Sequence, residues 1–127
     1  MKHITREQKV AEFHKAGKQG YEKMPLSKML ASRWTLLEEE FWEVAEAIDE
    51  AESVSGYKEG LLKELCDLQY VLSGTVDALG WTPVFDVAFN RVHENNMTKF
   101  DEGIKYDENG KIRKPASYKN VDLSDLV

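Results

Sequence analysis

The sequence predicts an all-α protein, a bundle of four or five helices followed by a short C-terminal hairpin or irregular tail. Apolar residues recur at spacings of three and four through most of the first 98 residues, which is the period of an amphipathic helix. Glycine and proline interrupt these segments at short intervals, so the connecting loops should be short. Short loops between helices with one apolar face each favour a bundle.

The first two helices are predicted from their capping signals and apolar spacing. A first helix should cover about residues 5–17, since Thr5 and Gln8 form a capping-box pattern at its start. A second helix should begin near Ser27, which is placed to cap it, and continue to Ile48 as one long helix or as two pieces. The residues at the centre of its predicted core face are Leu37, Phe41, Val44 and Ile48.

The next two helices are bounded by glycine and proline. Leucine and valine keep helical spacing through about residues 58–79, and Gly80 supplies a C-terminal stop. Thr82 followed by Pro83 has the pattern of an N-cap and first helical position, which predicts a fourth helix to about Asn95.

The C-terminal part has a different character. Asn109 and Gly110, the usual pair of a tight two-residue turn, lie between short apolar stretches and predict a small hairpin or an irregular arm. We therefore expect a single domain over residues 1–127, with a helical core at about 5–98 and an arm at about 101–127.

Composition excludes several classes of function. The chain of 127 residues has a net charge of −6 and a pI of about 5.1, which argues against binding a nucleic-acid polymer through a broad basic surface. No apolar run is long enough to span a membrane, and the first residues have no signal-peptide pattern. With Cys66 as the only cysteine, no intrachain disulfide can form. We expect a cytoplasmic protein without a membrane partner.

Two pairs of acidic residues lie on semi-apolar rows of the second and third helices. Glu40 and Glu43 are three residues apart on one row, and Glu64 and Asp67 repeat this spacing on the other. One interpretation is that each pair is a solvated helix flank. The other is a divalent cation site between facing helices, because burying four carboxylates without a counter-charge would cost several kcal/mol each. Carboxylate oxygens are the ligands that Mg²⁺ and Mn²⁺ prefer.

These acids resemble a known motif. The pattern "EExxE", which begins at Glu39, and the later "ExxD" are similar to those of the all-α nucleoside triphosphate pyrophosphohydrolases. This superfamily includes the MazG family, the dimeric dUTPases and phosphoribosyl-ATP pyrophosphohydrolase. Further segments that resemble the short, single-domain MazG-like proteins are "EFHKAG" at 12–17, "DLQYVLSG" at 67–74 and "VHENNMTKF" at 92–100.

The resemblance implies a MazG-like bundle with a specific reaction. That reaction is Mg²⁺-dependent cleavage between the α and β phosphates of an NTP or dNTP, with Mn²⁺ as an alternative ion, giving a nucleoside monophosphate and pyrophosphate. The implied metal ligands are Glu40, Glu43, Glu64 and Asp67. Glu39 is implied to orient or deprotonate the attacking water. The resemblance also implies self-association as a dimer or tetramer, and an origin in bacteria or phage-infected cells.

Substrate-binding candidates come partly from the resemblance and partly from helical position. The resemblance implies phosphate or sugar contacts for Asn96 and Lys99 of "NMTK", with Arg91 as a looser candidate. The candidates that carry more than one interpretation are Arg33, Tyr70 and His14. Arg33 could pair with the acids, reach a phosphate or form a structural ion pair. Tyr70 is either a core residue or a neighbour of the nucleotide, and His14 is either structural or substrate-binding.

Two alternative functions stay open. The first is hydrolysis of phosphoribosyl-ATP in histidine synthesis, which the shared acidic motif does not exclude. A non-catalytic nucleotide-binding helical module would also keep the fold and bind metal and nucleotide without releasing pyrophosphate.

Overall fold

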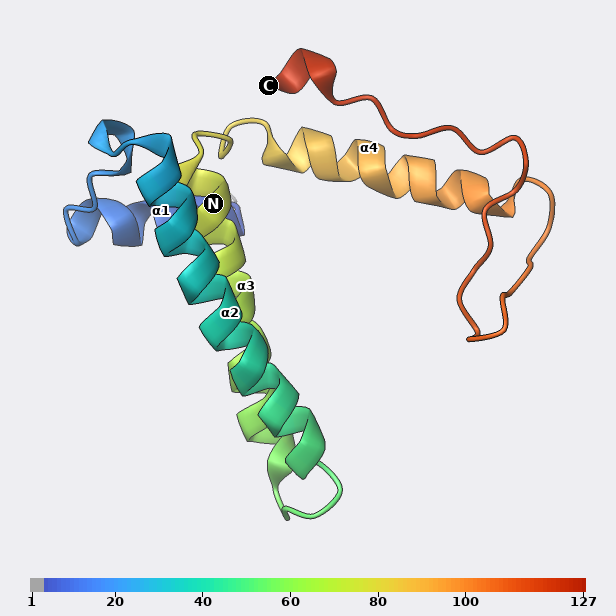
Figure 1. Ribbon diagram of the computed structural model, residues 1–127, viewed down its shortest axis with the longest axis horizontal. Helices are drawn as coiled ribbons and strands as arrows, with labels where there is room; N and C mark the ends of the chain where they lie inside the picture. Colours follow the sequence, from blue (N-terminus) through green and yellow to red (C-terminus); the bar gives the residue numbers. More distant parts are fainter. Residues whose placement is uncertain (1–3) are drawn as a thin grey trace. The chain divides into compact units, whose positions relative to one another are not determined.

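Helices provide the regular structure of the computed structural model, which describes residues 4–127 (Figure 1). The extended pairing in that range is a single antiparallel bridge between Tyr106 and Ile112. The all-α prediction is therefore confirmed. No helix between residues 4 and 127 combines the length and the apolar character that crossing a bilayer requires.

The chain divides into two units, the first ending at Thr82 and the second comprising Pro83–Val127. The first contains α1, α2 and α3, and the second contains α4 and the C-terminal arm. The single domain expected over residues 1–127 stays a prediction.

Helix α1 (Arg6–Ala16) begins with the predicted capping box. The backbone N–H of Gln8 donates to Thr5 Oγ1 at 3.1 Å, and the Thr5 N–H donates to Gln8 Oε1 at 2.8 Å. These two bonds satisfy donors that the first turn of a helix leaves without partners. A short 3₁₀ turn, η1 (Tyr21–Lys23), then leads to α2.

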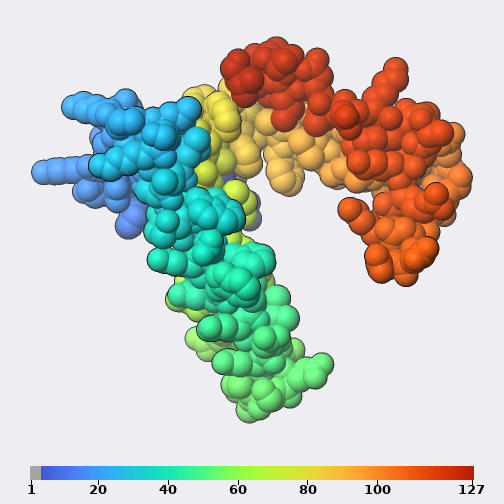
Figure 2. Space-filling model, in the orientation of Figure 1, coloured from blue at the N-terminus to red at the C-terminus, as the bar shows by residue number. Residues whose placement is uncertain are grey.

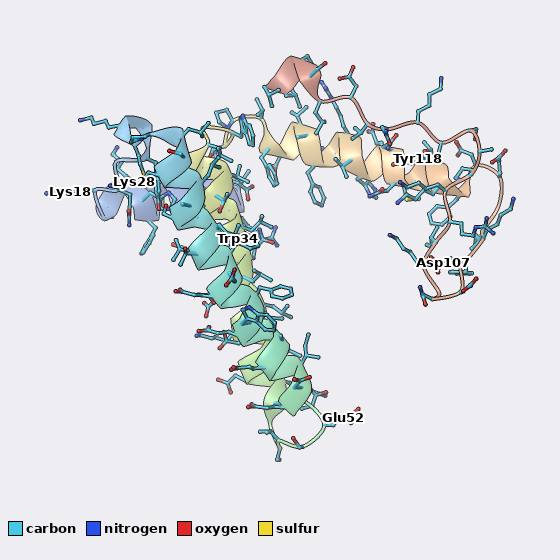
Figure 3. All side chains as sticks on the ribbon, in the orientation of Figure 1. Lys18, Lys28, Trp34, Glu52, Asp107 and Tyr118 are labelled. Carbon is cyan, nitrogen blue, oxygen red and sulfur yellow. The ribbon has the colours of Figure 1, made fainter. Side chains whose placement is uncertain are left out.

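Helices α2 (Leu26–Glu50) and α3 (Tyr57–Ala78) form a long antiparallel hairpin (Figure 1). Their connecting turn, which contains Glu52 (Figure 3), ends at Gly56 with φ of +75°, a conformation that favours glycine. The predicted cap at Ser27 is wrong. The helix begins earlier, because the carbonyl of Pro25 already accepts from the Met29 N–H at 3.0 Å.

The packed face of α2 lies closer to the acids than its apolar pattern predicted. Val44 is buried as expected, but Phe41 and Ile48 are each 56% exposed. Met29 and Arg33 are buried together with Val44, so the centre of the buried side is rotated by about 50° from the predicted one. This rotation places the row of Glu40 on the face that packs against α3.

A buried arginine cluster joins α2 to α3. Arg33 is 4% exposed and donates to Thr75 Oγ1 at 3.1 Å, to the Val71 carbonyl at 2.9 Å and to the Tyr21 hydroxyl at 2.8 Å. The guanidinium passes over Gly74, where a Cβ atom would lie 2.5 Å from Nη2. Glycine at this position therefore lets the arginine lie flat against α3.

Helix α4 (Phe85–Met97) begins later than predicted. Val84 occupies the N-cap position without a side-chain hydrogen bond. The expected cap, Thr82, instead donates its hydroxyl to Asp77 Oδ1 at 2.9 Å. The predicted N-cap is wrong because a partner in α3 takes the hydroxyl.

The C-terminal arm folds back on α4 inside the second unit. Arg91 donates through both terminal nitrogens to Asp125, at 2.5 and 2.9 Å, and Asn95 donates to the Tyr118 hydroxyl at 2.7 Å. The predicted two-residue turn at Asn109 and Gly110 is wrong in length, because the Asp107 N–H donates to the Lys111 carbonyl at 2.8 Å and leaves a turn of residues 108–110, in which Gly110 has φ of +78°. The bridge between Tyr106 and Ile112 makes this part of the arm a small hairpin, and a 3₁₀ turn, η3 (Ser124–Leu126), lies near the end of the chain.

Candidate metal centre

Four carboxylates converge between α2 and α3. Glu40 and Glu43 lie one turn apart on α2, and Glu64 and Asp67 lie one turn apart on α3. One carboxylate oxygen from each residue lies within 4.8 Å of the others. The antiparallel hairpin produces this arrangement, because each i, i+3 pair lies on the stripe of its helix that faces the other helix and the two pairs lie at the same level.

The hydrogen bonding of this cluster is incomplete in a way that suits a cation. Glu40 Oε2 and Glu64 Oε2 are both buried and have no hydrogen-bond partner. A buried acceptor without a partner is costly, and more so when it carries a charge. Oxygen-only donors of this kind match the preference of Mg²⁺ and Mn²⁺. The residues present therefore fit a hard divalent cation.

The close carboxylates change the protonation of two groups, Glu64 and Lys63. A hydrogen bond with Glu43, together with burial, raises the pKa of the Glu64 carboxyl above its ordinary value. On the other side, Lys63 Nζ lies 2.7 Å from Asp67 Oδ2 and 3.6 Å from Glu64 Oε1. The hydrogen bond to Asp67 and the nearby acids raise the pKa of the Lys63 ammonium. The nearby acids raise both pKa values, although for Glu64 they contribute less than the hydrogen bond and burial do.

Without divalent cations, the free energy of unfolding is expected to fall as pH rises from about 4.5, which is the ordinary pKa of a glutamate carboxyl such as that of Glu64. The folded chain holds the Glu64 proton more tightly than the unfolded chain does. Between the two pKa values the unfolded state binds fewer protons, so stability declines with rising pH. Urea unfolding in EDTA at a series of pH values measures this slope.

Glu64→Gln should flatten that slope, since the amide does not titrate. Glu59→Gln is the matched control, because Glu59 is an exposed acid of the same helix outside the cluster. An equal slope for wild type and Glu64→Gln would contradict the assigned role of this carboxyl.

The predicted catalytic residue, Glu39, is exposed on α2 beside Glu40. It is not one of the four acids that converge. Its role in activating water stays a prediction.

Arg33 and His14 both lie in buried polar surroundings. All the hydrogen bonds that Arg33 donates end on neutral oxygens, so in the described chain it forms no ion pair with the four acids. His14 Nδ1 lies 2.8 Å from Asp77 Oδ2, and its ring packs 4.9 Å from that of Tyr21. These contacts favour the structural interpretation of both residues.

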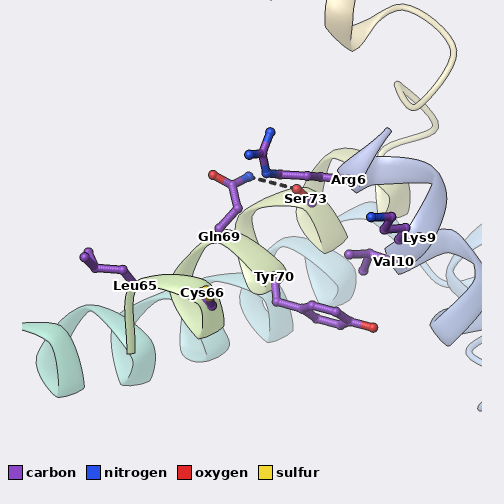
Figure 4. Close-up of a pocket in the computed structure, with 8 residues that line it drawn as sticks. All are labelled: Arg6, Lys9, Val10, Leu65, Cys66, Gln69, Tyr70 and Ser73. Carbon is purple, nitrogen blue, oxygen red and sulfur yellow. Dashed lines mark hydrogen bonds between the residues drawn. The ribbon is translucent and has the colours of Figure 1, made fainter. Parts of the chain in front are cut away.

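Tyr70 lies on the α1 side of α3. Its ring meets Phe13 edge-on at 5.5 Å, and it lines a cavity of about 360 Å³ between the two helices (Figure 4). In the same region Gln69 donates to the fully buried Ser73 at 2.9 Å, and Ser73 donates to Glu7 at 2.6 Å. Tyr70 therefore contributes to the contact between α1 and α3.

The remaining candidates belong to the second unit. Arg91 is occupied by Asp125, while Lys99 Nζ lies 5.8 Å from the centre of the Tyr118 ring. Asn96 is exposed near the end of α4. Their contacts with substrate stay predictions.

Sequence reasoning overlooked Lys63. A lysine on an exposed helix flank is usually solvated, and nothing in its own pattern marks it. Its position directly before Glu64, and one turn before Asp67, was the available signal.

Comparison with known proteins places these features in a family. The model of the phosphoribosyl-ATP pyrophosphohydrolase family matches residues 9–96, which is more than half of the chain and includes all four converging acids. A search of curated proteins finds no match. The family consists of enzymes that hydrolyse an acid anhydride, as the acidic motif predicted. The chain therefore belongs to the phosphoribosyl-ATP pyrophosphohydrolase family, within the all-α, MazG-like superfamily of nucleoside triphosphate pyrophosphohydrolases.

Proposed function

We propose that this protein hydrolyses an NTP or dNTP between the α and β phosphates and releases a nucleoside monophosphate and pyrophosphate. The observation that carries the proposal is the convergence of four carboxylate oxygens within 4.8 Å, two of whose residues have a buried oxygen without a hydrogen-bond partner. Pyrophosphohydrolases of this superfamily generally use a divalent metal, which supports the same conclusion.

The acids of the hairpin would bind the metal and activate the attacking water. Glu40, Glu43, Glu64 and Asp67 would hold Mg²⁺, or Mn²⁺ in its place. The bound cation supplies neutralising charge for the phosphates, which an acidic protein otherwise repels. Glu39 would take a proton from the water whose oxygen attacks the α phosphorus. The bond from that phosphorus to the bridging oxygen breaks, and pyrophosphate leaves with the electron pair.

The second unit contains further candidates for contact with substrate. Asn96 and Lys99 would contact phosphate or sugar, as the resemblance of "NMTK" to the superfamily implies. Arg91 would take part only after exchanging its contact with Asp125, so it is the weaker candidate.

Phosphoribosyl-ATP is a second candidate substrate, because the matching family model is that of phosphoribosyl-ATP pyrophosphohydrolase. The chemistry at the phosphorus would be the same. The candidate substrates differ away from the triphosphate, so the acids alone do not distinguish them.

We also propose self-association as a dimer or tetramer in the cytoplasm of a bacterial or phage-infected cell. Large apolar side chains are exposed on both helices of the hairpin. Helix α2 is the part of the surface coloured from cyan to green in Figure 2. The exposed side chains include Trp34, Phe41, Trp42, Ile48 and Leu62. The rings of Phe41 and Trp42 lie 5.6 Å apart, and exposed apolar side chains that cluster are typical of a contact between proteins.

The test is pyrophosphate release from a panel of NTPs, dNTPs and phosphoribosyl-ATP in the presence of Mg²⁺. We expect release from one or two of them, and loss of that release in EDTA and in Asp67→Ala. Asp49→Ala serves as the control, because Asp49 is an exposed acid of α2 outside the cluster.

Release that continues in EDTA would contradict the metal-dependent reaction. Binding of metal and nucleotide without release from any member of the panel would favour the non-catalytic module instead. Circular dichroism of Asp67→Ala checks that loss of activity does not reflect loss of the fold.

A further inference from the structure

Lys63 is the basic side chain that forms ion pairs with the four-acid cluster among the described residues. Its ammonium lies 2.7 Å from Asp67 Oδ2 and 3.6 Å from Glu64 Oε1, and no other lysine, arginine or histidine among residues 4–127 forms an ion pair with the cluster. The side chain is 65% exposed, so it reaches the acids from the solvent side.

The ammonium and a divalent cation need the same oxygens. Asp67 and Glu64 together supply half of the proposed ligand set. A divalent ion bound there would also repel a positive charge only a few ångströms away. Lysine has a flexible four-carbon stem and its exposed ion pairs are weak, so it can leave the acids at little cost.

Lys63 also lines a cavity beside the acids. The cavity has a volume of about 490 Å³ and is lined by Glu43, Glu64 and Lys63, and towards the hairpin turn by Glu46 and Glu50. Lys63 is thus the positively charged residue of its lining, whereas a polyphosphate carries several negative charges. The charge of a bound divalent ion and the Lys63 ammonium would both offset the repulsion between a polyphosphate and this acidic lining.

We propose that Lys63 is an exchangeable counter-ion, which pairs with Asp67 and Glu64 in the metal-free protein and moves to a phosphate oxygen of the substrate when a divalent cation takes those carboxylates. This proposal rests on the proposed function, because it identifies a further substrate contact at the same site.

The first test is a titration of the full-length protein with Mn²⁺ alone, at low ionic strength, followed by electron paramagnetic resonance. Lys63→Met is expected to bind Mn²⁺ about three- to tenfold more tightly than wild type, because it removes a competing charge. Lys58→Met is the matched control, since Lys58 is an exposed lysine of α3 outside the ion pairs of the cluster, and its affinity should stay near that of wild type. Unchanged or weaker binding by Lys63→Met would overturn the exchange.

The second test is calorimetric binding of inorganic pyrophosphate in saturating Mn²⁺. Lys63→Met is expected to bind pyrophosphate at least about fivefold more weakly, as loss of one charge-assisted hydrogen bond implies, and Lys63→Arg should retain most of the affinity. Equal affinity of Lys63→Met and wild type would overturn the phosphate contact. Neither titration depends on turnover, so a wild-type protein that releases no pyrophosphate would defeat the proposed function while these measurements still decide the role of Lys63.

Discussion

Glu40→Gln is expected to lower kcat/KM for pyrophosphate release by at least about a hundredfold, because the charge stabilisation that a bound metal provides is worth several kcal/mol. Glu40 lies on the face of α2 that packs against α3, and its Oε2 is buried without a hydrogen-bond partner. An amide has nearly the same shape but no negative charge, so it weakens the metal site with little change in packing. Initial rates at several Mg²⁺ concentrations measure the effect.

Glu38→Gln is the control for this substitution, since it removes one exposed acid two residues earlier in the same helix. Its kcat/KM should stay within about threefold of wild type, as for most surface changes. In EDTA, Glu40→Gln should be at least as stable as wild type, because it reduces repulsion among four close carboxylates. Activity of Glu40→Gln close to that of Glu38→Gln would refute the metal-binding role of Glu40.

Arg33→Met is expected to reduce the free energy of unfolding by about 3 kcal/mol or more, since hydrogen bonds from a charged donor are worth about 1.5 to 3 kcal/mol each. The guanidinium is buried and donates hydrogen bonds to the Thr75 hydroxyl, the Val71 carbonyl and the Tyr21 hydroxyl. Methionine fills part of the volume and leaves these oxygens without their donor. Urea or thermal unfolding in EDTA separates this loss from any effect of metal binding.

Lys28→Met provides the comparison, because Lys28 is an exposed base of the same helix. Its effect on stability should be within about 0.5 kcal/mol. If both variants lost the same small amount, the buried arginine cluster would not hold α2 against α3. Because Arg33 precedes Glu40 by about two turns, this cluster also fixes how the acids of α2 face those of α3.

The helices and the two acidic pairs were predictable because their signals are local. Helical spacing, a capping box and glycine stops depend only on neighbouring residues, and α1, α2 and α3 follow them closely. The i, i+3 spacing of the acids likewise depends only on the helix in which they lie. The structure brings one oxygen of each acid together, while metal ligation by them stays a prediction.

The wrong predictions for the core face of α2 and for the cap at Thr82 concern contacts between residues that lie in different elements. Apolar spacing counted Phe41 and Ile48 as core, yet both face away from the side that packs on α3. Thr82 had the pattern of a cap, but Asp77 accepts its hydroxyl. Lys63 is a different case, because it was overlooked although both acids with which it pairs follow it in the same helix. Sequence pattern indicates which residues share a helix face, but not what that face meets.

The α2–α3 hairpin also has a consequence for how the protein folds. All four acids lie between residues 40 and 67, and a turn of residues 51–56 joins the helices that carry them. Closing so short a loop costs little entropy, and contacts of low sequence separation form early in folding. The carboxylates would then repel one another while much of the chain is still unfolded. Divalent cations present during synthesis would therefore promote formation of the hairpin itself, as well as stabilise the finished protein.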